Sequence, residues 1–317
     1  MNQKLRIVIT GVTSFIGVHL VKYFIGLGYE VTTTLSRPQN QYSDQRLDRL
    51  NFALQLGAHI EVLDITCQAK VKEFINRLRP TYWIHHAGWA RNYQSFDYDL
   101  TKAHSINLEP LEYIYPALKN AGCLGLILTG SSAEYSDTTC AALESHLCAP
   151  KMPYGLAKLS QTLRANQLAE QYLLPTRVAR VFIPFGPMDA PEKLVPSVLK
   201  ALRANIPVSL TVCSQIRDFL FIDELVSGYG SLIRDLQRKS NFDIFNLSSG
   251  QPVTLKDFLL EIACLLKADA KLLKFGDRLL RDGDIGSSWG DNSKAQSILG
   301  WKPDSLKKGI VRYLNNI

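Results

Sequence analysis

The feature that most constrains the fold of this chain is a regular alternation between short apolar runs and amphipathic stretches of helical length. The apolar runs are rich in β-branched residues and predict strands over residues 5–10, 30–35, 59–63, 82–86, 125–129 and 177–182. The stretches between them predict helices over residues 15–27, 69–78, 99–121 and 154–172. Right-handed helical crossovers of this kind join parallel strands. We therefore predict an α/β fold with a doubly wound parallel sheet.

The alternation loosens after about residue 187, which predicts a change of architecture. Helices are predicted over residues 194–204, 223–236 and 255–266, with strands near Val208 and over residues 242–247. We expect residues 1–187 to form mainly a large domain and residues 188–317 mainly a smaller α/β lobe. Some interleaving of segments is compatible with the pattern, and the substrate is expected between the two parts.

The composition is that of a globular protein, with 46% apolar and 21% charged residues. The net charge of +7 comes from Lys and Arg residues scattered along the chain, so nucleic acid is not an expected partner. A modest positive field instead suits a ligand that carries phosphates. The cysteines lack CxxC spacing, so no metal site is predicted. Neither a leader pattern nor a membrane-spanning apolar stretch is present, and we expect a cytoplasmic protein that does not bind a membrane.

A glycine-containing turn follows the first predicted strand and opens the first predicted helix. Gly11 permits a tight turn, Gly17 permits a close approach of helix and strand, and Ser14 occupies the place where a third glycine is usual. The amides at the start of the helix predict a site for the pyrophosphate of a dinucleotide. The predicted contacts are Gly11, Thr13, Ser14, Phe15, Ile16 and Gly17.

The end of the second strand distinguishes between the two nicotinamide dinucleotides. A carboxylate there binds the adenosine ribose hydroxyl of NAD, whereas a basic residue suits the additional phosphate of NADP. The sequence places Ser36 and Arg37 at this point and no acidic residue. We therefore predict that NADP(H) is bound in preference to NAD(H).

Tyr154 and Lys158 are four positions apart and lie on one face of a predicted helix. A tyrosine, with an ordinary pKa of about 10, is a poor acid–base catalyst at neutral pH until an adjacent cation stabilises its phenolate. Lys158 can supply that charge. Ser131 ends the fifth predicted strand, where its hydroxyl can hydrogen-bond a substrate oxygen beside the tyrosine. These three residues are the predicted catalytic group.

Taken in order, these motifs make the chain resemble the extended short-chain dehydrogenase/reductase family, which comprises nucleotide-sugar epimerases, dehydratases and reductases. The resemblance covers almost the whole length. Its first half consists of TGxxxxIG, Asp64, His85-His86-Ala87-Gly88, Asn107, Ser131 and Tyr154 with Lys158. Its second half consists of residues 180–187, 217–224, 281–284 and 299–303, which are similar to RxFNxYGP, RDFxxVxD, RPGD and LGWxP. Ile183 departs from the family's asparagine, which removes one hydrogen bond to nicotinamide or substrate.

The resemblance implies a Rossmann sheet that binds the cofactor, and a role for each matching residue. Tyr154 would exchange a proton with the sugar oxygen, Ser131 would polarise that oxygen, and Lys158 would lower the pKa of the phenol and hold the nicotinamide ribose. The other implied contacts are Asp64 and Ile65 to adenine, Ala87 to the turn beside the cofactor, Ser132 to the substrate, and Arg217 and Arg281 to the diphosphate of a nucleotide sugar.

Three reactions remain open within this resemblance, namely epimerisation, 4,6-dehydration and simple reduction. Dehydration needs an additional acid and base, which related dehydratases have directly after the catalytic hydroxyl. This chain has Ser132 and Ala133 there, and the carboxylate of Glu134 is displaced by one position. Dehydration is therefore the least favoured of the three reactions.

The predicted cofactor favours reduction over epimerisation, because an epimerase generally retains NAD whereas a reductase exchanges its cofactor and usually draws on NADPH. The leading hypothesis is reduction of a nucleoside-diphosphate 4-keto-6-deoxyhexose to the 4-hydroxy sugar. The alternatives are an NAD-dependent nucleotide-sugar 4-epimerase and a non-catalytic dinucleotide-binding regulator. Helices 99–121 and 154–172 pair between two copies in many relatives, so a homodimer is also expected.

Overall fold

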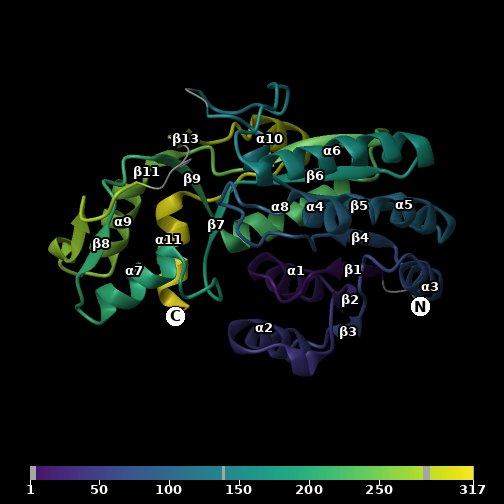
Figure 1. The fold of residues 1–317 in the computed structure, drawn as a ribbon, viewed down its shortest axis with the longest axis horizontal. Helices are drawn as coiled ribbons and strands as arrows, with labels where there is room; N and C mark the ends of the chain where they lie inside the picture. The colour runs from purple at the N-terminus through teal and green to yellow at the C-terminus, as the bar shows by residue number, and fades with distance from the viewer. Residues whose placement is uncertain (1–4, 138–139, 281–285, 317) are drawn as a thin grey trace.

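A seven-stranded parallel β-sheet forms the centre of the computed structural model, which describes residues 5–137, 140–280 and 286–316 (Figure 1). The strands lie in the order β10-β6-β5-β4-β1-β2-β3. Their bounds are β1 Arg6–Thr10, β2 Glu30–Leu35, β3 His59–Val62, β4 Tyr82–His85, β5 Gly125–Ser131, β6 Thr176–Val181 and β10 Phe242–Leu247. The predicted doubly wound parallel sheet is confirmed. Because β1 pairs with both β2 and β4, the strand order reverses at β1, where ligands bind in sheets of this kind.

Side chains of the sheet enter two separate hydrophobic layers, one on each face. In β1, Ile7 and Ile9 belong to one buried cluster and Val8 belongs to the other, as the two-residue period of a strand requires. The first layer is covered by α1 Phe15–Gly26, α2 Asp44–Gln55 and α8 Ile222–Asp235. The second layer is covered by α3 Gln68–Leu78, α5 Leu111–Asn120 and α6 Pro153–Tyr172.

The prediction of one continuous helix over residues 99–121 is wrong. The structure has a short helix α4, Leu100–Ala103, a π-helical turn η2, His104–Leu108, and then α5. Pro110 has no amide hydrogen with which to continue the helical hydrogen bonds. The amide of Glu109 instead donates to the carbonyl of His104, which is the π-helical spacing.

Helix α2 was not predicted from the sequence. Only Arg49, Leu50 and Ala53 are buried in it, so its apolar face is too narrow to give a clear helical period. Short 3₁₀ turns complete this half of the chain at η1, Gln39–Gln41, and η3, Ser132–Glu134.

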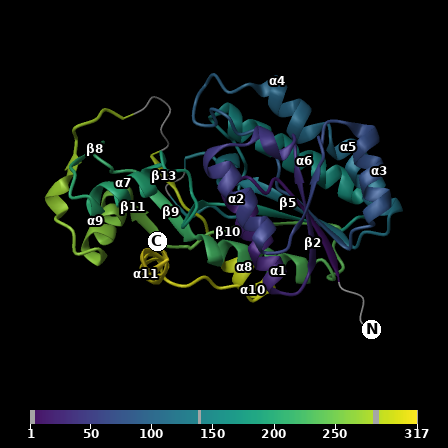
Figure 2. The same ribbon diagram turned by 90° about the horizontal axis from the view of Figure 1, so that it is seen from below.

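The smaller lobe lies at the end of the molecule opposite to α3 (Figures 1 and 2). Its short strands form two sheets, with β9 pairing with β7, β11 and β13, and with β8 pairing with β12. The bounds of its elements are β7 Ile183–Phe185, α7 Leu194–Arg203, β8 Val208–Leu210, β9 Ile216–Phe221, β11 Pro252–Thr254, α9 Leu255–Leu265, η4 Ala270–Leu272, β12 Leu273–Phe275, β13 Ser287–Ser288 and α11 Leu306–Asn315.

Three segments after residue 187 return to the large sheet. Strand β10 pairs with β6 in parallel, and α8 packs against α1 on the first layer. Helix α10, Ser293–Leu299, packs against β10 and α8. The predicted strand over residues 242–247 is therefore confirmed, but it belongs to the large sheet. A division at residue 187 stays a prediction, to which the structure adds that the two parts of the chain are interleaved.

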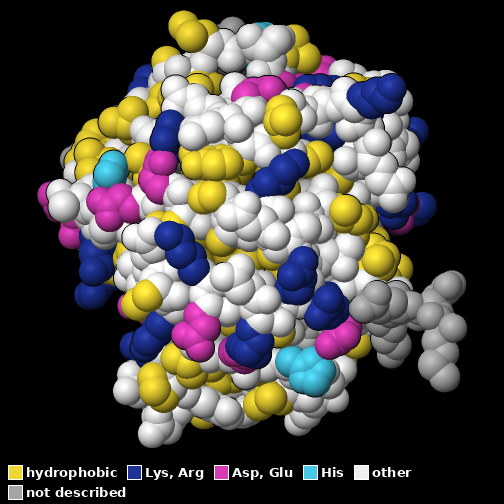
Figure 3. Space-filling model, turned by 90° about the vertical axis from the view of Figure 1, so that its right-hand side faces the viewer, with side chains coloured by type: hydrophobic (Ala, Val, Ile, Leu, Met, Phe, Trp, Pro, Cys, Tyr) yellow, Lys and Arg dark blue, Asp and Glu magenta, His cyan; other side chains and the backbone are white. Residues whose placement is uncertain are grey.

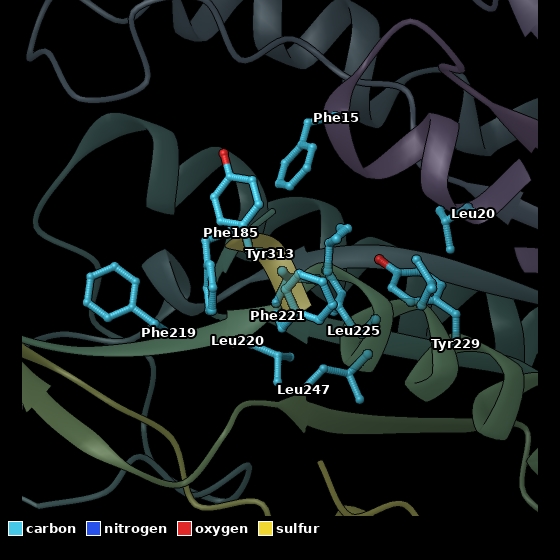
Figure 4. Packing of buried hydrophobic residues seen from close by; sticks show 14 of the residues in the cluster. Phe15, Leu20, Phe185, Phe219, Leu220, Phe221, Leu225, Tyr229, Leu247 and Tyr313 are labelled. Atoms are coloured by element: carbon cyan, nitrogen blue, oxygen red, sulfur yellow. The ribbon is translucent and has the colours of Figure 1, made fainter. Parts of the chain in front are cut away.

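One buried cluster continues from the large sheet into the smaller lobe (Figure 4). Phe15 and Leu20 of α1 belong to the same cluster as Phe185 and Phe221. Further into the lobe, the rings of Phe219 and Phe258 stack with centroids 3.8 Å apart and planes at 8°. This shared core holds the lobe in a fixed position beside the carboxyl ends of the sheet strands.

Candidate active site

The predicted dinucleotide turn lies between β1 and α1, at the reversal of strand order. Gly11 has a φ of +86°, and a Cβ added there would lie 3.1 Å from the Cα of Ala87. A Cβ at Gly17 would lie 2.2 Å from the carbonyl oxygen of Gly11, so a larger residue would separate helix from strand. Both glycines are therefore required by local geometry, and the surface beside them is kept open at backbone level.

Ser14 replaces the usual third glycine and caps α1. Its hydroxyl accepts from the amide of Gly17 and donates to the carbonyl of Gly11, each at 2.9 Å. Within the described residues, the amides of Phe15 and Ile16 have no acceptor, and the first turn of α1 contains no acidic side chain. An anion such as pyrophosphate fits this helix end, where the amides of Phe15 and Ile16 would hold it.

Ala87 is held beside the turn by the side chain of Thr10. The Thr10 hydroxyl accepts from the amides of His86 and Ala87 at 2.9 and 2.8 Å. Ala87 therefore lies against Gly11, just after the carboxyl end of β4, and its role beside the cofactor stays a prediction.

The end of β2 lies next to the turn, because Thr34 is paired with Thr10. Beyond it, Ser36 and Arg37 are exposed, and the Arg37 guanidinium lies 4.6 Å from the ring centre of Tyr42. The Ser36 hydroxyl is 3.3 Å from the Tyr42 hydroxyl. Arg37 thus lies over an aromatic face in a cation–π arrangement, and its side chain is exposed.

Asp64 and Ile65 follow β3 at the same edge of the sheet. An Asp64 carboxylate oxygen accepts from both the amide and the hydroxyl of Thr66, at 3.0 and 2.7 Å. Ile65 is buried, and its carbonyl accepts from the hydroxyl of Tyr113 at 2.6 Å. Their predicted contact with adenine stays a prediction.

Ser131 and Tyr154 come together at the end of β5, where the Ser131 hydroxyl is near enough to the phenol to oppose the rise of its pKa. Gly155, which the sequence reasoning did not single out, explains this approach, since a Cβ there would lie 2.1 Å from the carbonyl oxygen of Ala133. The rings of Tyr93 and Tyr98 each contact the Tyr154 ring edge-on at 5.6 Å. Burial raises the pKa of Tyr154 well above its usual range, with the Ser131 hydroxyl opposing the shift. Tyr154 is therefore a neutral acid in the protein alone.

Lys158 lies one turn after Tyr154 on α6, with its side chain buried. Its ammonium donates to the Thr129 carbonyl and to Gln161 Oε1, both at 2.6 Å. Burial lowers the pKa of Lys158 to about 8, and the nearby Glu134 carboxylate opposes this shift. The ammonium form therefore persists at neutral pH within reach of the catalytic edge.

His86 links the dinucleotide turn to the catalytic strand, which the sequence reasoning did not foresee. Its Nε2 is 2.8 Å from the Ser14 hydroxyl, and its Nδ1 is 3.1 Å from the Thr129 hydroxyl. Thr129 is in turn 2.8 Å from the Tyr229 hydroxyl. Only the three-dimensional pairing of β1, β4 and β5 brings these groups together, so no local signal in the sequence could have found them.

Glu134 is fully buried and unavailable to a substrate. One carboxylate oxygen accepts from the Ser131 amide and the other accepts from the Arg180 guanidinium, each at 2.9 Å. The strand ends at Ser131, and η3 carries the Glu134 side chain into the interior. Ser132, the predicted substrate contact, remains half-buried at the start of this turn.

Of the two arginines predicted to bind the diphosphate, the structure describes Arg217 but not Arg281. Arg217, on β9, donates to the carbonyl of Ile216 at 2.9 Å, and its guanidinium lies 3.5 Å from the carbonyl of Gly286. Arg281 lies outside the described residues. Ile183 is half-buried in β7 and packs on the first hydrophobic layer, so it contributes a nonpolar surface in place of the asparagine amide.

Neither a metal-binding cluster nor a membrane-spanning helix is found among the described residues. Among residues 5–137, 140–280 and 286–316, no group of three or more His, Cys, Asp and Glu side chains is placed to hold a metal ion. None of the helices in the described part of the chain combines the length and apolar character that a membrane span requires. On the face shown in Figure 3, Lys and Arg are interspersed with Asp and Glu.

Comparison with known proteins agrees with this geometry. Two similar proteins are both named CDP-abequose synthase. The one from Salmonella muenchen is 23% identical over 98% of this chain and 97% of its own length. The one from Salmonella typhimurium is 29% identical over 42% of this chain and 45% of its own length. A solved UDP-glucuronic acid 4-epimerase from Bacillus cereus, a Tyr-to-Phe variant in complex with NAD, has the same fold, with a TM-score of 0.84 and 20% identity over 98% of each chain.

A family model described as the NAD dependent epimerase/dehydratase family matches residues 7–248, which include the dinucleotide turn and the catalytic group. The matched segment covers most of the chain and all seven strands of the large sheet. The chain therefore belongs to the NAD dependent epimerase/dehydratase family, whose members are enzymes that use a nicotinamide cofactor on nucleotide sugars.

Proposed function

We propose that this enzyme uses NADPH to reduce the 4-keto group of a nucleoside-diphosphate 4-keto-6-deoxyhexose. The observation that carries the proposal is the end of β2, where Arg37 lies over Tyr42 and no carboxylate is present. A guanidinium suits the additional phosphate of NADP, and an absent carboxylate removes the usual partner of the NAD ribose. NADPH in turn favours a reductase that exchanges its cofactor at every turnover.

The protonation state of the catalytic group supports the same direction of reaction. Bound NADPH supplies the hydride that reaches the carbonyl carbon. Tyr154, held as a neutral phenol beside Ser131, donates its proton to the carbonyl oxygen, which becomes the 4-hydroxyl. The ammonium of Lys158 favours the phenolate that is left, and Ser131 orients the oxygen. The dinucleotide would be held by the turn from Gly11 to Gly17.

The substrate class draws on two observations. The relatives named CDP-abequose synthase support a nucleoside-diphosphate sugar, one of them over nearly its whole length. Glu134 is occupied by Arg180 and the Ser131 amide, so the carboxylate that dehydration would require is not presented to the sugar. Reduction needs no such additional group. The candidate diphosphate contacts remain Arg217 and Arg281, with Ser132 at the sugar.

An NAD-dependent nucleotide-sugar 4-epimerase is the second candidate. It is favoured by the fold shared with the UDP-glucuronic acid 4-epimerase that carries NAD. The exposed side chains of Leu156 and Leu163 on α6 support the proposal of a homodimer for either enzyme, since they lie on a helix that many relatives use for pairing.

The first test is a parallel titration of the purified protein with NADPH and NADH, followed by tryptophan fluorescence. We expect NADPH to bind at least about ten times more tightly, and Arg37→Ala to remove the preference while Arg46→Ala, an exposed arginine on α2, preserves it. Oxidation of NADPH on addition of a nucleoside-diphosphate 4-keto-6-deoxyhexose would support the proposed reduction directly. Protein that purifies with tightly bound NAD would instead favour the epimerase.

The second test is the variant Tyr154→Phe, which removes only the acidic hydroxyl. Turnover should fall by about a thousandfold or more, because the proton donor is lost, whereas the dissociation constant for NADPH should change little. Tyr93→Phe, which keeps the ring against Tyr154, is the matched control and should retain most of the activity. Equal activities of Tyr154→Phe and the wild type would contradict the assignment.

A further inference from the structure

A hydrogen-bonded chain runs from the ammonium of Lys158 to the π-helical turn η2, and Gln161 is its central member. Gln161 follows Lys158 by three positions on α6, so both side chains lie on the same face of the helix. Gln161 Oε1 accepts from Lys158 Nζ at 2.6 Å. Gln161 Nε2 donates to the carbonyl of Asn107 at 2.9 Å. Gln161 is only 1% exposed, so both contacts are shielded from water.

The turn at Asn107 provides a fixed anchor for this chain. Pro110 and the π-helical spacing interrupt the regular helical hydrogen bonds here, and the Asn107 carbonyl accepts the Gln161 amide instead. The Asn107 side chain is itself fixed, because its Oδ1 accepts from the amide of Trp89 at 2.7 Å. The anchor therefore belongs to the same segment that packs Tyr98 against Tyr154.

The two ends of the Gln161 amide cannot be exchanged. Its nitrogen carries only donors and faces a carbonyl, so its oxygen must face the ammonium, which also carries only donors. Lys158 has three such donors, and the Thr129 carbonyl and Gln161 Oε1 accept two of them. One donor is left for a ligand hydroxyl or for Tyr154.

We propose that Gln161 is a positioning residue, which anchors Lys158 to the turn at Asn107 so that the remaining ammonium donor is aimed at Tyr154 and the cofactor ribose. The inference rests on the proposed function in one respect, namely that Lys158 takes part in the hydride-transfer reaction. A leucine or methionine at this position would fill the same space but would supply neither the acceptor nor the anchor.

The charged and titratable groups around Lys158 come from three elements. Glu134 of η3 favours the ammonium, although it is shared with Arg180. At the end of β4, the buried His85 and the half-buried His86 disfavour a second positive charge. Tyr154 lies on α6 itself. In these surroundings the uncharged acceptors at Gln161 and Thr129 supply the direct hydrogen bonds that keep the ammonium charged.

The direct experiment follows the titration of Lys158 by NMR in protein whose lysine side chains are isotopically labelled at Cε, with the resonance assigned by its absence in Lys158→Met. Gln161→Leu should lower the midpoint of the Lys158 titration by about one pH unit, because the ammonium loses a hydrogen-bond acceptor. Gln161→Glu should raise it by about as much, because a carboxylate favours the ammonium. Gln167→Leu, an exposed glutamine on the same helix, should leave it unchanged.

The pH profile of ketosugar reduction gives a second measurement. The loss of activity at alkaline pH should move down in Gln161→Leu and up in Gln161→Glu, whereas a merely structural role would move it in neither direction. Unchanged midpoints in both folded variants would overturn the proposal. If the wild type reduces no ketosugar, the proposed function fails, while the NMR titration still decides the role of Gln161. If Gln161→Leu does not fold, Gln161→Met supplies the same comparison.

Discussion

At the scale of single residues, the active site depends on approaches so close that only glycine permits them. Gly155 brings the first turn of α6 against the carbonyl of Ala133, and this contact sets the distance between Tyr154 and Ser131. The backbone at Gly155 has an ordinary helical conformation, so its requirement is purely one of space. A methyl group there therefore acts on packing and on catalytic geometry together.

We expect Gly155→Ala to lower the free energy of unfolding by about 2 kcal/mol, because the added Cβ would overlap a backbone oxygen that cannot move freely. Activity should fall with it, since α6 must shift away from β5. Gly26→Ala is the control, because a Cβ there meets nothing and alanine is the better helix former. Urea unfolding of both variants measures the difference, and equal stabilities would contradict the steric argument.

The residues that sequence reasoning could find are those whose signal is local. Gly11, Gly17, Tyr154 and Lys158 lie in short motifs at strand-to-helix junctions or on one helical face. The structure shows that neither glycine position has space for a side chain, and the roles of all four residues stay predictions. Gln161 carries no such signal, because its function depends on a carbonyl from a distant segment. The contact between His86 and Ser14 also has no local signal in the sequence, because it forms only when β1 and β4 lie side by side.

At the scale of secondary structure, α2 joins the dinucleotide turn to the connection between the two lobes. Arg49, 6% exposed, donates to the carbonyl of Thr13 at 2.9 Å and to the carbonyl of Met188 at 2.9 and 2.7 Å. Gln45 accepts from the same guanidinium at 3.0 Å. Met188 has a φ of +64°, an unfavourable conformation for a side-chain-bearing residue, which these bonds help to maintain.

We expect Arg49→Lys to lower the free energy of unfolding by about 2 kcal/mol, because one ammonium cannot reach the acceptors that the planar guanidinium spans. Binding of NADPH should also weaken, since Thr13 belongs to the dinucleotide turn. Arg46→Lys, on the exposed face of α2, should change neither quantity. Urea unfolding tests the effect on stability, and titration with NADPH tests the effect on binding. An unchanged affinity for NADPH in Arg49→Lys would show that Arg49 does not influence the cofactor site.

The strand pattern explains why most elements were predictable and α2 was not. The buried strand β2 is marked by continuous β-branched residues, and its observed bounds match the predicted ones. Helix α2 instead buries a guanidinium at the position where a hydrophobic residue would have revealed its inward face. The break in the helix before α5 required attention to Pro110, whose missing amide outweighs the helical periodicity on either side.

At the scale of the whole molecule, a buried histidine, His85, and a half-buried one, His86, couple stability to pH. His85 has its Nδ1 directed at the indole N–H of Trp83, at 3.4 Å, so the nitrogen that protonation would use already faces a donor. Burial lowers the pKa of His85 to about 3 and that of His86 to about 4, from an ordinary value of 6.5, and the charge of Lys158 adds to both shifts. Both residues lie in the centre of the sheet, so their protonation opposes the folded state as a whole.

The sign of the effect follows from comparing the two states. Between about pH 4 and pH 6.5 the unfolded chain binds protons that the folded protein does not, so the unfolding free energy falls as the pH is lowered. The stability contributed by each neutral histidine is complete above pH 6.5 and is lost progressively towards its folded pKa. We expect a loss of roughly 1 to 2 kcal/mol for each histidine at about pH 5.

Urea unfolding at about pH 7.5 and pH 5 measures this loss, and His86→Gln isolates one contribution. The variant should be less stable than the wild type at the higher pH, because the contacts with Ser14 and Thr129 are altered. Its stability should nevertheless depend less on pH, since one of the two protonations is gone. His59→Gln removes an exposed histidine and should preserve the full dependence. If the unfolding free energy changes with pH as much in His86→Gln as in the wild type, His86 does not contribute to the pH dependence of stability.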